Sequence, residues 1–117
     1  GLIDEAQETM NQVQELAGRI NEGVSLAEMY RVMGELMVKR SSQIEAETWF
    51  LRAIETARLQ NARLWELLSA TSLGWLYLKQ GRREDARLVV SGVYDWFTEG
   101  FNTESLREAR KLLDELQ

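Results

Sequence analysis

The sequence has no cysteine, no histidine and no proline among its 117 residues. Without cysteine and histidine the chain has no disulfides, no thiol nucleophile, no imidazole base and none of the usual zinc ligands. This excludes most catalytic and metal-binding constellations, so we expect neither enzymatic activity nor a cofactor. Proline is absent from a chain dominated by Leu, Ala, Glu, Gln, Arg and Met, which favour helices.

Long apolar runs and charge of one sign are also missing. No apolar run approaches the roughly 18 residues of a membrane-spanning helix, and the start GLIDEAQETM lacks the pattern of a signal peptide. The net charge of −5 comes from interspersed acidic and basic residues, which form no basic stripe for binding phosphates. We therefore expect a cytoplasmic protein that binds neither membrane nor nucleic acid.

The remaining composition is that of an ordinary globular domain. Hydrophobic residues make up 44% of the chain and charged residues 28%. A chain of this length fits one domain, which we expect to span residues 1–117. No segment alternates between apolar and polar residues as a strand does, so the fold class is predicted to be all-α.

Small and large apolar residues recur along the chain with a constant 40-residue period. Small residues align with small ones and large with large, as expected where one helix passes close to another. The equivalent sets are Ala6, Ala46 and Ala86; Met10, Phe50 and Val90; Val13, Ala53 and Val93; Met33, Leu73 and Leu113; and Leu36, Leu76 and Leu116.

Capping patterns and glycines predict the helix ends. Serine followed three residues later by glutamate, a capping box, occurs at 25–28, 42–45 and 105–108. Gly23, Gly81 and Gly100 are predicted to end helices. Short connections make successive helices antiparallel. The six predicted helices cover residues 2–21, 25–40, 43–60, 62–80, 83–99 and 104–116.

Each repeating unit resembles a tetratricopeptide repeat. The resemblance is carried by YRVMGELM (30–37) and ATSLGWLY (70–77), with Gly34 placed to meet Ala46 and Gly74 placed to meet Ala86. It implies antiparallel hairpins stacked into a right-handed superhelix. Two departures are the period of 40 in place of 34 and the lack of a closing proline.

Residues 44–116 also resemble the C-terminal helical repeats of bacterial signalling proteins that join a class III adenylate or guanylate cyclase domain to a predicted ATPase. The most specific element is WFTEGF followed by Asn and Thr, residues 96–103. The resemblance implies a role in signal transduction. The cyclase and nucleotide-binding motifs belong to other domains, so no activity is carried onto residues of this chain.

The phase of the repeat predicts half-repeats at both ends, and with Gly1 at the start we interpret the chain as a fragment of a larger protein. An apolar stripe near the start would then lack its cover. Its exposure predicts self-association, such as a homodimer of the fragment. The stripe comprises Leu2, Ile3, Ala6, Met10, Val13, Leu16, Ala17 and Ile20.

The segment VYDWFTEGF (93–101) concentrates four aromatic residues. Tyr94, Phe97 and Phe101 continue the apolar stripe of the preceding helix, which favours a packed joint over a ligand box. Trp96 lies off that stripe, and we expect it to pack against Leu106 or Leu113, with Gly100 allowing the chain to turn back.

The helix predicted over 62–80 is apolar nearly all round, which indicates a central helix covered on both sides. In a repeat array the first helices of the units line the concave surface, so Leu68, Trp75 and Leu78 are candidate anchors for a protein or peptide partner, or for a neighbouring domain. Two further hypotheses are a self-association element that sets the oligomeric state and a small-ligand sensor with Trp75 and Tyr77 in its pocket. The candidate partner-binding residues are Arg31, Glu35, Lys39, Leu68, Thr71, Trp75, Leu78, Lys79 and Lys111.

Overall fold

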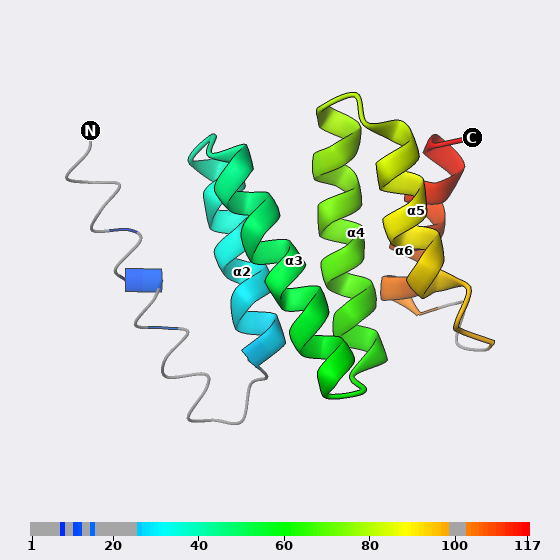
Figure 1. Cartoon of the computed structure of the whole chain (residues 1–117), viewed down its shortest axis with the longest axis horizontal. Coiled ribbons are helices and arrows are strands. Elements are labelled where there is room, and N and C mark those ends of the chain that lie inside the picture. Colours follow the sequence, from blue (N-terminus) through cyan, green and yellow to red (C-terminus); the bar gives the residue numbers. More distant parts are fainter. Residues whose placement is uncertain (1–7, 9–10, 13–14, 16–25, 99–102) are drawn as a thin grey trace.

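The computed structural model describes residues 26–98 and 103–117, together with the isolated positions 8, 11, 12 and 15. These residues form antiparallel helices without any strand in the described part, which confirms the all-α class (Figure 1). The helices are α2 (Leu26–Lys39), α3 (Gln43–Leu59), α4 (Arg63–Lys79), α5 (Arg83–Tyr94) and α6 (Glu104–Glu115).

Four of the predicted helices agree with these bounds to within one residue. The prediction for 83–99 is wrong at its end, because α5 stops at Tyr94 and the chain turns at Asp95 and Trp96. Of the helix predicted over 2–21, the four described positions are helical. The apolar stripe of that segment, and the predicted helix stops at Gly23 and Gly100, lie outside the described residues.

Three turns of the same geometry connect α2 to α5. Each contains one residue in the left-handed conformation, with φ of 60° at Ser41, 53° at Asn61 and 77° at Gly81. In the first turn the Ser42 amide donates to the Met37 carbonyl at 2.9 Å, and the equivalent bonds of the other turns measure 2.9 and 2.8 Å. This is the Schellman closure, which satisfies the last carbonyls of a helix. It ends α2, α3 and α4 in the same way and reverses the chain each time.

The predicted capping boxes are not formed where the structure describes them. Ser42 is the N-cap of α3, but its side chain makes no capping hydrogen bond, because its backbone already closes the preceding helix and has a ψ of 78°. Ser105 lies inside α6, whose N-cap is the extended residue Thr103. The third predicted start, Ser25, lies outside the described residues.

Helix α4 occupies the centre of the described fold. It contacts α2, α3, α5 and α6, so its apolar residues are covered on several sides, as the sequence predicts. Equivalent positions of the 40-residue period are buried together, including Leu36, Leu76 and Leu116. The period in the sequence therefore corresponds to a repeated position in the core.

Two glycines allow the helices to approach closely. Gly74 meets Ala86 as predicted, since a Cβ there would lie 3.7 Å from the Ala86 carbonyl oxygen, but the nearest atoms at both glycines belong to larger side chains. A Cβ at Gly34 would collide with the ring of Phe50, and a Cβ at Gly74 would lie 2.6 Å from Val90 Cγ2 and 2.8 Å from Leu112 Cδ2. Both partners on the following helix lie one turn beyond the predicted alanine. The side chain at that position fills the space the glycine leaves, because side chains in a helix stack over the neighbouring turn.

Helix α6 departs from the repeat on one side. Three buried residues of α4, spaced by three and four positions, form a stripe on one side of that helix. Forty positions later, the equivalent residues of α6 are charged and exposed. The described core thus closes at α6 with a polar outer face, as terminal units of repeat arrays do. The pairs in chain order are Leu67 and Arg107, Ala70 and Arg110, and Gly74 and Asp114.

Alanine at Gly74 is expected to lower the free energy of unfolding by about 1–3 kcal/mol, because the added methyl overpacks the contact with α5 and α6. Gly92 on α5 is the matched control, since nothing lies within 4 Å of its Cβ position. Alanine there is expected to raise the stability by about 0.5–1 kcal/mol through helix propensity. Urea unfolding measures both, and equal effects would contradict the close approach at Gly74.

Giving α6 the residues of α4, with Arg107→Leu, Arg110→Ala and Asp114→Gly together, is expected to cause self-association. The substitutions remove the ion pair between Arg110 and Asp114 (3.1 Å) and expose an apolar stripe. Light scattering at increasing concentration should show a mass about twice that of the wild type, as for a dimer. The charge-preserving control, Arg107→Lys with Arg110→Lys, should keep the wild-type mass. An unchanged mass in the triple variant would mean that the charges do not close the core.

Candidate functional site

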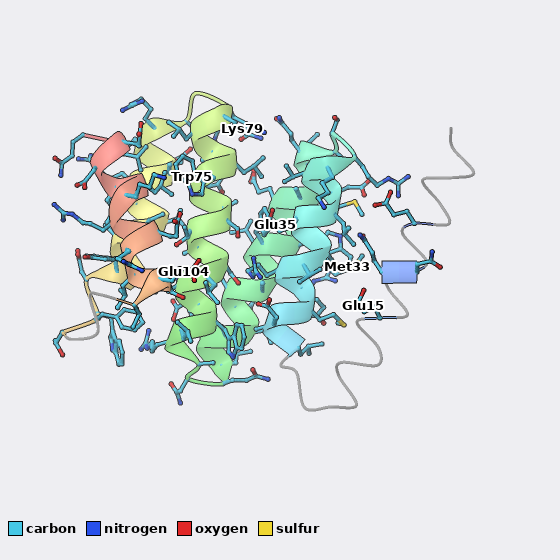
Figure 2. The ribbon with its side chains drawn as sticks, turned by 180° about the vertical axis from the view of Figure 1, so that it is seen from behind. Glu15, Met33, Glu35, Trp75, Lys79 and Glu104 are labelled. Carbon is cyan, nitrogen blue, oxygen red and sulfur yellow. The ribbon has the colours of Figure 1, made fainter. Side chains whose placement is uncertain are left out.

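An open groove of about 650 Å³ runs along the face formed by α2, α4 and α6. Helix α2 forms one wall and α6 the other, while α4 forms most of the floor between them. Figure 2 views the molecule from this side, with Lys79 and Glu104 toward opposite ends and Trp75 and Glu35 between them. The lining residues are Arg31, Glu35, Val38, Phe50, Leu68, Thr71, Ser72, Trp75, Leu76, Lys79, Glu104, Ser105 and Glu108.

The structure brings six of the nine candidate residues together in this groove. Leu78 instead packs against the core, Lys39 is exposed at the end of α2, and Lys111 lines a separate depression over α5 and α6. The six residues that line the groove are Arg31, Glu35, Leu68, Thr71, Trp75 and Lys79.

The floor of the groove is apolar and continuous with the core. Trp75 is partly buried, and it both packs against the core cluster and lines the groove. Leu68 lies two turns earlier on the same helix, and buried Phe50 and Leu76 lie below. Such a surface can bury an apolar side chain of a partner without rearrangement of the helices.

Thr71 and Ser72 are the polar groups of the floor. The Thr71 hydroxyl donates to the Leu67 carbonyl at 2.8 Å, so its proton is used within α4 and its oxygen remains as an acceptor. This arrangement explains how a threonine can be buried in a nearly apolar helix.

The α2 wall carries a paired cation. Arg31 donates to the buried carboxylate of Glu28 through Nε at 2.9 Å and a terminal nitrogen at 2.6 Å, and it lies 3.9 Å from Glu35. The hydrogen bonds to Glu28 raise the pKa of Arg31, and they outweigh the opposing effect of burial. Arg31 is therefore a fixed, neutralised part of the wall.

The α6 wall consists of Glu104, Ser105 and Glu108, which the sequence analysis did not select. The 40-residue period contains a signal for one of them, because Glu108 is equivalent to Leu68 of the floor and to Glu28 of α2. Glu104 and Ser105 are placed by the start of α6 at Thr103, two residues before the predicted cap.

Tyr77 does not join Trp75 in the groove. Its ring is buried on another side of α4, under the Arg82 guanidinium at 4.1 Å. Burial is the main cause that raises the pKa of Tyr77, followed by the charge of Glu47. Tyr77 therefore does not line the groove that contains Trp75, and the small-ligand pocket between them stays a prediction.

The aromatic segment after α5 forms only part of the predicted joint. Tyr94 and Phe97 pack against the core. Trp96 is 54% exposed, with its ring edge-to-face on Phe97 and 4.9 Å from the Arg63 guanidinium, and its contact with Leu106 or Leu113 stays a prediction. Because α5 ends at Tyr94, the turn directs Trp96 toward the start of α4. Phe101 lies outside the described residues.

Carboxylates outnumber cations three to two among the lining residues of the groove.

Within the described part of the chain, no cluster of three acidic, histidine or cysteine side chains is arranged to hold a metal ion. Among these same residues, no helix has the length and apolar character needed to cross a bilayer.

Comparison of the chain with protein-family models, with curated proteins and with solved structures finds no match. The geometry of the groove and the chemistry of its walls therefore carry the functional inference. An apolar floor between two polar walls is suited to binding a chain segment with an apolar anchor.

Replacing Trp75 by alanine is expected to lower the free energy of unfolding by about 2 kcal/mol, because a partly buried ring is removed from the core surface. Trp96→Ala is the matched control and should cost less, about 1 kcal/mol, since this ring is mostly exposed and loses one cation–π contact and one edge-to-face contact with Phe97. Urea unfolding monitored by circular dichroism gives both values. A larger loss at Trp96 would contradict the described burial.

Proposed function

We propose that this chain is a non-catalytic protein-interaction module that binds a segment of a protein partner, or of a neighbouring domain, in the groove over α4. The observation that carries the proposal is the convergence of six predicted partner-binding residues from α2 and α4 on one open groove. Trp75 and Leu68 act as the apolar anchor site. The charged walls then set the register of the bound segment.

The antiparallel helices and the 40-residue period support a tetratricopeptide-like arrangement of six helices in a right-handed superhelix. The resemblance of residues 44–116 to the tail repeats of cyclase and ATPase signalling proteins supports a cytoplasmic role in bacterial signal transduction. In this proposal the module couples binding in the groove to the activity of a neighbouring domain.

Self-association is the second candidate function. It is supported by exposed apolar side chains on α3, where Ile44 is 86% and Leu59 is 81% exposed. Symmetric contacts between such residues would set the oligomeric state of the parent protein. Light scattering of the wild type over a concentration series separates the two functions, because a constant monomer mass leaves the groove as the interaction surface.

The groove proposal is tested by selecting binders from a displayed library of short random peptides and measuring synthetic copies by fluorescence anisotropy. Leu68→Ser is expected to weaken their binding at least about tenfold, because it removes an anchor of the floor. Leu88→Ser is the matched control, since Leu88 is 60% exposed on α5 and does not line the groove. Peptides that bind the Leu68→Ser variant and the wild type equally would overturn the proposal.

A further inference from the structure

We propose that the segment bound in the groove is positively charged, with lysine or arginine side chains placed against Glu104 and Glu108 of α6 and an apolar side chain on Trp75 and Leu68. This inference rests on the proposed function of the groove. It adds the chemistry of the partner, which follows from a difference between the two walls.

The α2 wall offers no free cation to an anionic group, because its one cation lies between two carboxylates. The Arg31 guanidinium is held by Glu28 and lies near Glu35, so its positive charge is already compensated within the helix. The side chain of Arg31 is 23% exposed, and its fork is occupied by the bidentate contact. A bound anionic group would have to displace Glu28, which is buried and would be left without this partner.

The α6 wall is different, because its carboxylates are uncompensated. Glu104 and Glu108 are exposed, and neither forms an ion pair or hydrogen bond with another described residue. They lie one turn apart on the same side of α6, which places their Cβ atoms about 6 Å from one another. Alternate side chains of an extended segment are spaced by about 6.6 Å, so two cations of a bound segment can meet both carboxylates.

The helix dipole accounts for only one of the two acids. Glu104 is the first residue of α6, where a negative charge stabilises the helix dipole. Glu108 lies in the second turn, beyond the range of this effect. The like charge of Glu104 disfavours it and the opposite charge of Lys111, three residues later, offsets this, so the helix by itself gives little preference for an acid here. The position of Glu108 beside the apolar floor is therefore better explained by a cationic partner.

The groove also has a direction. Lys79, at the end of α4, has no ion-pair partner among the described residues and lies toward the end of the groove away from Glu104 (Figure 2). The basic part of the bound segment then lies toward the start of α6. Any acidic residue of the segment lies toward Lys79.

The test uses the peptides selected by the wild-type protein. Lysine and arginine should be enriched in the selected sequences over the unselected library, beside an aromatic or aliphatic residue. The double variant Glu104→Gln, Glu108→Gln is expected to weaken binding of synthetic copies at least about fivefold at low salt, with a smaller effect at roughly 0.5 M NaCl. Urea unfolding checks that the variant remains folded.

The matched control is Glu45→Gln with Glu55→Gln, which changes the net charge equally on exposed positions of α3 outside the groove. This control should leave binding within about twofold of the wild type. An equal loss in both double variants would reduce the effect to overall charge and overturn the inference.

The outcomes separate this inference from the function on which it rests. Peptides that depend on Leu68 but bind the Glu104→Gln, Glu108→Gln variant unchanged would overturn the charge inference and leave the groove function standing. Peptides that are independent of Leu68 would overturn the groove function itself. Enrichment of acidic peptides held by Lys79, lost in Lys79→Gln, would also overturn the inference.

Discussion

The close approach of α4 to its neighbours at Gly74 is the contact on which the groove depends. Because this position has no side chain, Leu112 of α6 and Val90 of α5 both reach the backbone of α4. Helix α6 thereby lies directly beside α4, although α5 separates them in the sequence. The first turns of α6 are then close enough to Leu68 and Trp75 to form the second wall of one groove.

Charges near the helix interfaces are divided between structural and available groups. Glu66 is almost completely buried, and its carboxylate accepts from Arg58 at 2.7 Å and Arg63 at 3.1 Å, which ties the end of α3 to the start of α4. Removing both arginines would leave the buried Glu66 carboxylate unpaired, whereas the arginines themselves are partly exposed. Glu104 and Glu108 of α6 form no such pair with another described residue, which leaves both carboxylates available for the proposed partner.

Local backbone chemistry was harder to predict than helix content. Gly81 is a helix stop in both the sequence analysis and the structure, but Ser41 and Asn61 occupy the same left-handed position without glycine. The sequence pattern for capping boxes failed at Ser42, whose ψ of 78° departs from the extended conformation of a capping residue. The cation–π contact of Trp96 with Arg63 was not predicted, because it depends on α5 ending at Tyr94, earlier than expected.

The helical class, the 40-residue period and most helix bounds were determined by the sequence alone, since they follow from apolar spacing and propensity within single segments. The same spacing identified α4 as the central helix and selected Trp75 and Leu68. Only the tertiary structure decided which charges stand beside them. Glu104 joins the groove from α6, far along the chain from Leu68, and Lys111 of the same helix leaves it. Such membership depends on the side of α4 against which α6 packs, a contact between distant segments that no local pattern encodes.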